Sequence, residues 1–170
     1  MEYCQRTLKD ELESQSFWTS FSPHDIWMLF KEIVSAVSYV HSLGCVHRDL
    51  KPSNIFIAES GVKLGDFGLA AGPIFDVDSP RSNYERKMLQ ADDDTRDVGT
   101  CLYSAPESKE TGDYTSKVDI YALGVILLEL WHPFNTGMER IVVIQQATGK
   151  RELPSDFTAK YPKQSEMILR

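Results

Sequence analysis

Two short polar motifs constrain this chain of 170 residues more than any other feature. The first is the run His47–Asn54, with the sequence HRDLKPSN, and the second is Asp66–Gly68, with the sequence DFG. Two apolar stretches between them, Ile55–Ala58 and Val62–Leu64, flank Glu59–Gly61, which is the pattern of a tight β-hairpin. The pattern therefore predicts two polar loops, one at each end of a single hairpin.

The polar residues of these loops match the needs of phosphoryl transfer from a magnesium nucleotide. A carboxylate such as Asp49 can accept the proton of an attacking hydroxyl, and a cation such as Lys51 can meet the transferring phosphate. A Lys two residues after the base lies where negative charge builds up during the reaction. Asn54 and Asp66 supply oxygen atoms for the metal. The alternative is that Asp49 and Asp66 are solvated loop carboxylates.

Composition excludes several other classes of function. Apolar residues make up 42% of the chain and charged residues 25%, as in ordinary soluble globular proteins. A net charge of -7 argues against nucleic acid or an anionic membrane as the main partner. Three cysteines without CxxC spacing indicate neither a disulfide framework nor a zinc site. The most apolar stretch, Val118–Trp131, carries two acidic residues and is too short to span a bilayer. We therefore expect a reduced, cytoplasmic protein.

The apolar periodicity predicts helices on both sides of the hairpin. A long helix is expected to begin after Ser22, because Ser22, Pro23 and Asp25 form an N-terminal capping signal, and to end at Gly44. The other predicted helices cover residues 7–12, 117–130, 138–147 and a stretch from 164 onwards. Gly149 and Pro154 are expected in loops. Residues 71–97 lack periodicity and are rich in Asp, Ser, Arg and Pro, which predicts a mobile loop.

These motifs, in this order, resemble the C-terminal lobe of a eukaryotic protein kinase, and the resemblance covers nearly the whole chain. It implies a mainly α fold with a few short β-hairpin strands, as in the C-terminal lobe of the bilobal kinase fold, with the N-terminal lobe absent. Residues 1–170 would then be a partial protein kinase domain, from the hinge to about helix H. Residues 66–107 would be its activation segment. The implied cofactors are ATP and Mg²⁺.

The resemblance also assigns roles to individual residues. It implies that Asp49 is the catalytic base, that Lys51 contacts the γ-phosphate, and that Asn54 and Asp66 bind magnesium. Lys at position 51 resembles serine/threonine kinases rather than tyrosine kinases. The implied adenine-binding residues are Glu2 and Cys4 of the hinge, where Cys4 would act through its backbone, and Phe56, which would lie under the base.

Two acidic residues are expected to support the site. Asp119 lies three residues after Ser116 and could complete a capping box. The resemblance implies instead that Asp119 accepts backbone hydrogen bonds from the catalytic loop, and a buried carboxylate needs such partners, which favours this second role. Glu107, in an Ala-Pro-Glu motif, is implied to pair with a late Arg, for which no evident candidate precedes Arg170. His47 and Phe67 are expected to be core residues.

Three residues are implied to be regulatory. Arg48 resembles the Arg with which kinases bind a phosphorylated activation loop, and added phosphate can order a segment by pairing with Arg. Thr95 is the expected phosphosite, whereas Thr100 could be a structural residue, a phosphosite or both. Ala71 stands where many loop-activated kinases carry a second basic residue. Its substitute is left open among Arg86, Lys87 and Arg96.

Three stretches resemble a narrower family, the kinases that phosphorylate the alpha subunit of translation initiation factor 2, and most of all the general control non-derepressible type. They are Met1–Cys4, Thr95–Thr100 and Pro133–Arg140. The resemblance implies that this alpha subunit is the protein substrate, that the context is translational control under stress, and that kinases pair through the missing lobe. It also implies that the helix beginning near Met138 docks the substrate. The alternative is an amphipathic helix that only packs against the core, because such a helix would have the same sequence pattern.

The expected absence of the N-terminal lobe leaves two functions open. The first is an active serine/threonine kinase whose chemistry is carried by the retained residues. The second is a catalytically inactive lobe that binds the substrate or another kinase subunit. Neither function calls for a direct nucleic-acid or membrane partner in this segment.

Overall fold

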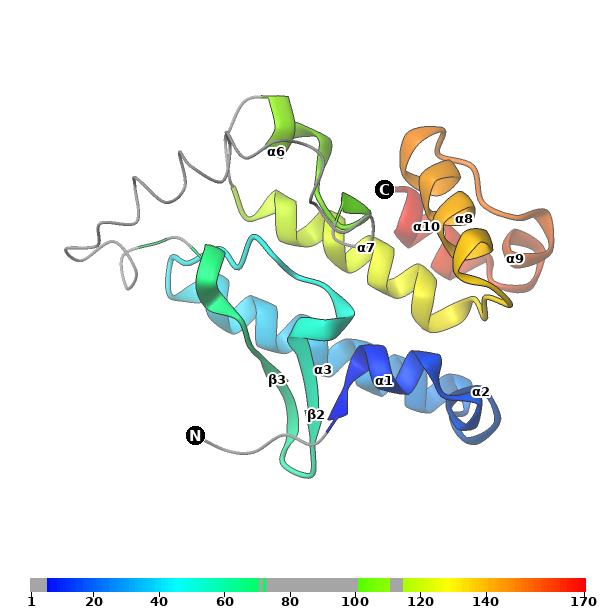
Figure 1. Cartoon of the computed structure of the whole chain (residues 1–170), viewed down its shortest axis with the longest axis horizontal. Coiled ribbons are helices and arrows are strands. Elements are labelled where there is room, and N and C mark those ends of the chain that lie inside the picture. Colours follow the sequence, from blue (N-terminus) through cyan, green and yellow to red (C-terminus); the bar gives the residue numbers. More distant parts are fainter. Residues whose placement is uncertain (1–5, 71, 73–100, 111–114) are drawn as a thin grey trace.

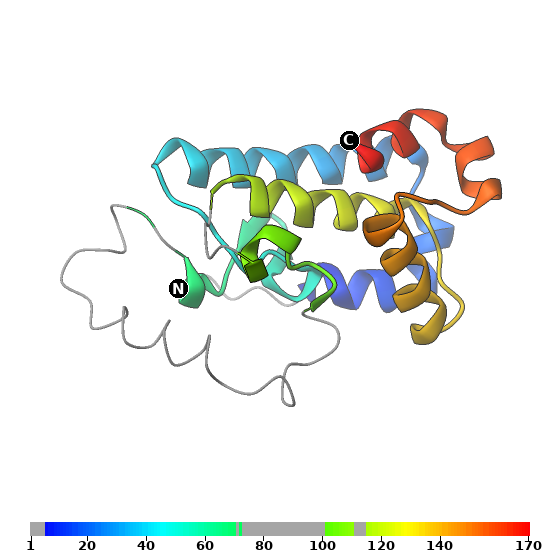
Figure 2. The same ribbon diagram turned by 90° about the horizontal axis from the view of Figure 1, so that it is seen from above.

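A computed structural model describes residues 6–70, 72, 101–110 and 115–170 of the chain. Helices dominate the described part, and α3 (Pro23–Ser42) packs beside α7 (Lys117–Trp131) at its centre (Figures 1 and 2). A small sheet lies on one side of this pair, and helices from the C-terminal third of the chain pack against α7 (Figure 1). The shorter helices are α1 (Leu8–Glu13), α2 (Gln15–Ser20), α6 (Pro106–Glu110), α8 (Gly137–Gly149), α9 (Ser155–Lys160) and α10 (Pro162–Leu169).

Helix α3 begins and ends where the sequence signals predict. The Ser22 Oγ accepts a hydrogen bond from the Asp25 backbone N–H at 3.3 Å, and the Asp25 carboxylate accepts one from the Ser22 N–H at 2.9 Å. This reciprocal capping box satisfies two N–H groups that the first turn leaves without helical partners. At the other end, Gly44 has a φ of 72°, the left-handed conformation that closes a helix most easily at glycine.

The predicted hairpin is confirmed and gains a third strand. Strands β2 (Ile55–Ala58) and β3 (Gly61–Leu64) pair antiparallel, with Ala58 opposite Gly61, so two residues form the turn. Gly61 has a φ of 102°, which a residue with a side chain adopts only with strain. Strand β1 (Arg6–Thr7) adds to the outer edge of β2, in the order β1-β2-β3. This two-residue strand was not predicted, because it is too short to show alternation.

Helix α7 forms the axis of the core and is buried along most of its length, although Ile120 near its start is exposed. Eleven of its 15 residues are buried, among them Ile126, Leu128 and Leu130, so the apolar run predicted as a helix lies mostly inside the protein. Buried side chains of α3 such as Ile33 and Phe30 pack in the same core. Two acids are also buried in α7, Asp119 near its start and Glu129 near its end. No helix in the described ranges has both the length and the apolarity needed to cross a bilayer.

The remaining elements agree in part with the prediction. Helices α8 and α10 are confirmed within a few residues, although Gly149, expected in a loop, is the last residue of α8. Helix α1 starts one residue late because Thr7 is its N-cap. Helices α2, α6 and α9 were not predicted, since five or six residues are too few to establish a helical period. The predicted mobile loop at residues 71–97 lies, apart from residue 72, outside the described residues.

Candidate active site

One buried carboxylate of α7 holds the loop that follows α3. The Asp119 Oδ1 accepts a hydrogen bond from the Arg48 N–H at 2.9 Å, and its Oδ2 accepts one from the His47 N–H at 2.9 Å. The Nε2 of His41, at the end of α3, lies 2.7 Å from the same Oδ2. The Ser116 side chain makes no capping bond, so the alternative capping-box role of Asp119 is wrong. Asp119 is 1% exposed, and these three contacts supply the partners that a buried carboxylate needs.

The backbone that Asp119 holds is in an uncommon conformation. Arg48 has a φ of 68°, in the left-handed region that costs a residue with a side chain free energy. The two hydrogen bonds to His47 and Arg48 offset this cost by fixing the turn on both sides of the strained residue. The turn then carries the chain directly into Asp49. The side chain of Arg48 is half-buried.

Asp49 is fixed by two neighbours in its own loop. The Lys51 Nζ lies 2.9 Å from the Asp49 Oδ2, and the Asn54 Nδ2 donates to the same oxygen at 3.0 Å. Asn54 also donates to the Asp49 backbone carbonyl at 2.8 Å, and its side chain is held by the short 3₁₀ turn Pro52–Asn54. The Asp49 and Lys51 side chains remain 13% and 20% exposed, so solutes can reach them. The structure therefore brings three of the sequence-predicted residues together.

The second polar loop is bonded directly to the first. The Gly65 N–H donates to the Asn54 carbonyl at 2.9 Å, and the His47 Nε2 donates to the Gly65 carbonyl at 3.0 Å. The His47 ring also contacts the Phe67 ring, with centroids 4.8 Å apart, and His47 is fully buried, in agreement with its expected core role. Asp66 lies between these anchors, exposed and with a φ of 56°. The loops that carry Asn54 and Asp66 are therefore adjacent.

Phe56 of β2 lies against Gly65. A Cβ atom added to Gly65 would come within 2.4 Å of the Phe56 ring, so only glycine allows this approach. The ring is half-buried, on the opposite face of β2 from Ile55, which is fully buried in the core. An aromatic face held in this way next to the polar loops suits contact with a planar group.

The oxygen donors of the two loops suit Mg²⁺. Magnesium prefers hard oxygen ligands and is usually held by one or two protein groups together with substrate phosphates. The Asn54 Nδ2 is engaged with Asp49, which leaves its Oδ1 as the ligand atom, and Asp66 supplies an exposed carboxylate from the neighbouring loop. The donor set therefore fits the expected metal.

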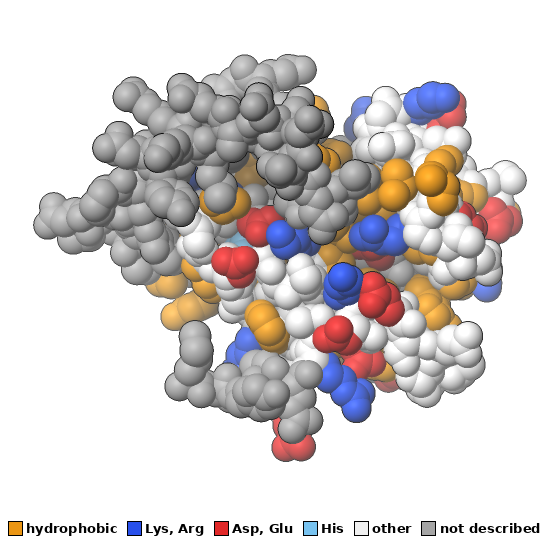
Figure 3. Space-filling model, viewed as in Figure 1, with side chains coloured by type: hydrophobic (Ala, Val, Ile, Leu, Met, Phe, Trp, Pro, Cys, Tyr) orange, Lys and Arg blue, Asp and Glu red, His pale blue; other side chains and the backbone are white. Residues whose placement is uncertain are grey.

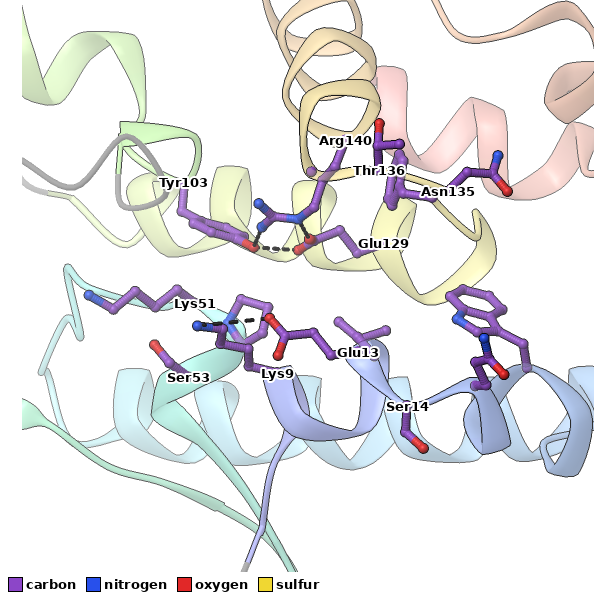
Figure 4. A pocket seen from close by; sticks show the side chains of 16 residues that line it. Lys9, Glu13, Ser14, Lys51, Ser53, Tyr103, Glu129, Asn135, Thr136 and Arg140 are labelled. Carbon is purple, nitrogen blue, oxygen red and sulfur yellow. Dashed lines mark hydrogen bonds and ion pairs between the residues drawn. The ribbon is translucent and has the colours of Figure 1, made fainter.

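A cleft next to Lys51 was not predicted. It has a volume of about 600 Å³ and is bounded by α1 and α2 on one side and by the start of α8 on the other. Charged side chains of both signs gather on this face of the molecule (Figure 3). In the close view, Lys9, Lys51 and Ser53 lie across the cleft from Tyr103, Glu129 and Arg140 (Figure 4).

The far wall of the cleft is a closed polar cluster of three residues, Tyr103, Glu129 and Arg140. The Tyr103 hydroxyl donates to the Glu129 Oε2, and Arg140 donates through Nε to the Glu129 Oε1 and through Nη2 to the Tyr103 hydroxyl, each at 2.5 Å. Burial, and then the negative charge of Glu129, raises the pKa of Tyr103. Burial raises the pKa of Glu129 against the opposing effect of Arg140. An acid within the apolar run 118–131 was the sequence signal for this cluster.

Of the other predicted site residues, the structure describes only some. Glu2, Cys4, Thr95 and Thr100 lie outside the described residues. Glu107 is half-buried in the first turn of α6.

The chain is similar in sequence to known protein kinases. A model of the protein kinase domain matches residues 1–167. The chain is 36% identical over 173 residues to the eIF-2-alpha kinase GCN2 of Arabidopsis thaliana, a match that covers 100% of the chain and 14% of that protein. It is 44% identical over 144 residues to eukaryotic translation initiation factor 2-alpha kinase 1 of Rattus norvegicus, with 82% of the chain and 22% of the relative covered. It is 37% identical over 180 residues to the human eIF-2-alpha kinase GCN2, with 99% and 11% covered.

The chain thus spans less than a quarter of the length of these relatives. The kinase-domain match extends over nearly all of it, and each of these relatives is more than 30% identical to it. The chain therefore belongs to the protein kinase family and is similar to the eIF-2-alpha kinases.

Proposed function

We propose that the chain transfers the γ-phosphate of ATP to a serine of the alpha subunit of translation initiation factor 2, as a cytoplasmic enzyme of translational control. The observation that carries this proposal is the fixed position of the Asp49 carboxylate, bonded to Lys51 and Asn54 in a loop that is bonded to the Asp66 loop. The names of the relatives supply the substrate class.

In this proposal each polar residue of the two loops has one task. Asp49 accepts the proton of the substrate hydroxyl, and Lys51 balances the charge that develops on the transferring phosphate. Asn54 and Asp66 hold Mg²⁺, while Phe56 contacts the adenine together with backbone groups of Glu2 and Cys4. Because catalysis of this kind is mainly positioning and electrostatics, the rigid bonding of the Asp49 loop supports it.

The outer face of α8 supports substrate docking. Met138 is 70% exposed and Val142 is 43% exposed, and the two side chains share one face because they are four residues apart. The opposite face packs in the core through Val143, Ile144 and Ala147. Packing alone explains the buried side, but it does not require apolar residues on the exposed side. We therefore assign the exposed apolar face, Met138 and Val142, to docking of the alpha subunit.

Regulation by phosphorylation is part of the same proposal. Thr95 would accept a phosphate, and Arg48, next to the base Asp49, would bind it and order the segment. Thr100 would serve as a second phosphosite or as a structural residue near the base. An activity assay on the Thr95→Ala variant tests this role, and unchanged activity would remove Thr95 as the switch.

One experiment separates the kinase from the alternative, a binding module. The purified chain is incubated with Mg²⁺, radiolabelled ATP and the alpha subunit, next to the Asp49→Asn variant and the control Asp156→Asn, which changes an exposed acid in α9. We expect phosphate transfer that is lost with Asp49→Asn and kept with Asp156→Asn. Binding of the alpha subunit without transfer by the unaltered chain would instead favour the binding module, for which the exposed face of α8 is the specific support.

A further inference from the structure

The first turn of α8 carries Met138, the most exposed of the large apolar side chains in the described ranges. Bonds within the turn shape it: Thr136 accepts a hydrogen bond from the Glu139 N–H at 3.0 Å, and Glu139 accepts one from the Asn135 N–H at 2.7 Å. These bonds are local and do not connect the turn to the rest of the domain. The apolar contacts of α8 with the core come after this turn, at the half-buried Ile141 and the buried Val143 and Ile144.

Arg140 is the side chain that ties this first turn to the domain by polar bonds. Its guanidinium donates hydrogen bonds to the Glu129 carboxylate and to the Tyr103 hydroxyl at the same time (Figure 4). Glu129 belongs to α7, and Tyr103 lies in the segment before α6. The Glu129 side chain is 3% exposed, so Arg140 is bonded to a group that cannot move without disturbing the core. Both oxygens of Glu129 are used, one by Arg140 and one by Tyr103.

The same three residues line the cleft that contains Lys51. A rotation or shift of the first turn of α8 would therefore change both the docking face and the wall of this cleft. A planar guanidinium with several donors in a fixed arrangement resists such rotation, whereas a lysine ammonium would not.

We propose that Arg140 is a positioning residue that, through Glu129 and Tyr103, fixes the docking face of α8 relative to the cleft beside Lys51. The inference rests on the proposed docking of the alpha subunit. A substrate held on Met138 and Val142 then presents its serine at Asp49 in a constant geometry. Arg140 itself does not touch the reacting atoms.

The Arg140→Lys variant tests the proposal without leaving Glu129 unpaired, because lysine keeps the positive charge. The double variant Glu129→Gln/Arg140→Met removes both charges together and guards against a loss of folding. Arg170→Ala is the matched control, since Arg170 forms an ion pair with Glu166 in which both side chains are more than two-thirds exposed. Each protein is used as the complete chain, and circular dichroism checks its folding.

Two readouts follow. Amide hydrogen exchange over residues 137–142 should accelerate about tenfold in Arg140→Lys and in the double variant, and stay unchanged in Arg170→Ala. The KM for the alpha subunit should rise about tenfold in both Arg140 variants with kcat within about twofold. The kcat/KM for a short peptide that contains the serine but cannot reach α8 should stay within about twofold.

An unchanged KM for the alpha subunit in both Arg140 variants would overturn the proposal. An equal loss with the peptide and the alpha subunit would also overturn it, because Arg140 would then act on the chemistry. The proposal would also be wrong if the KM for the alpha subunit rose in Arg140→Lys but returned to the value of the unaltered chain in the double variant. Arg140 would then serve only to neutralise the charge of Glu129. The unaltered chain could phosphorylate the peptide but neither bind nor phosphorylate the alpha subunit. This result would refute the alpha subunit as the substrate, and with it the role of Arg140 in positioning that substrate. Hydrogen exchange would still show whether Arg140 holds α8.

Discussion

Replacing Asp119 is the change from which the structure predicts the largest local effect. Its two carboxylate oxygens accept the backbone N–H groups of His47 and Arg48, both at 2.9 Å. The Asp119→Asn variant keeps one oxygen and turns the other acceptor into a donor. One N–H of a buried or half-buried residue then loses a charge-assisted hydrogen bond of about 1.5–3 kcal/mol. The left-handed conformation of Arg48 loses its support at the same time.

We therefore expect Asp119→Asn to lower the free energy of unfolding by about 2–3 kcal/mol, and Asp119→Ala to lower it by about 4 kcal/mol because both N–H groups lose their acceptor. Urea unfolding followed by tryptophan fluorescence measures this loss, as a midpoint lowered by roughly 1–2 M at an m-value of about 2 kcal/mol/M. The exposed residue Asp156 gives the matched control, and Asp156→Asn should change stability by less than about 0.5 kcal/mol. A loss below about 1 kcal/mol for Asp119→Ala would refute the reasoning, since two charge-assisted hydrogen bonds to a buried carboxylate should contribute more.

Three further changes, the first with a matched control, have defined outcomes. Gly65→Ala should lower stability by about 1–3 kcal/mol and weaken ATP binding measured by calorimetry, because its Cβ would collide with the Phe56 ring. Gly149→Ala, with nothing within 4 Å of its Cβ, should be neutral or slightly stabilising, and equal effects of the two variants would contradict the close contact. Thr136→Ala removes the N-cap of α8 and should lower the free energy of unfolding by about 1 kcal/mol in thermal melts; an unchanged melting temperature would argue against the cap. Hydrogen bonds from Ser22 lower the pKa of Asp25 below its ordinary value of 3.8, so its contribution to stability is present above that value and lost as the pH falls through the folded-state pKa. Asp25→Asn should therefore lose stability less steeply than the unaltered chain below about pH 4, and parallel pH curves would disprove the linkage.

The elements that local sequence signals specify were predictable from the sequence. Ser22, Pro23 and Asp25 announce the start of α3, and Gly44 its end, because capping depends on residues that are close in the chain. The hairpin β2–β3 follows from two apolar stretches around a turn that needs Gly61. The hydrogen bonds from His47 and Arg48 to Asp119 were expected from the kinase resemblance rather than from periodicity.

The rest depends on contacts between distant segments. Tyr103, Glu129 and Arg140 meet only after α7 and α8 have packed, and no local pattern marks a Tyr or an Arg as part of such a cluster. The cleft beside Lys51 was missed for the same reason. The nucleotide and regulatory roles of Glu2, Cys4, Thr95 and Thr100 stay predictions, because these residues lie outside the described part of the chain.

The two buried acids of α7 give this helix a further consequence. They are ten residues apart, which in an α-helix corresponds to an axial separation of about 15 Å. Asp119 bonds the loop of the proposed base, and Glu129 bonds the helix proposed to receive the substrate. Because α7 is enclosed by the core along most of its length, it acts as a rigid spacer between these two places. Inserting or deleting one residue between the acids would turn one of them by about 100° relative to the other, and so would separate recognition from chemistry even if the protein still folded.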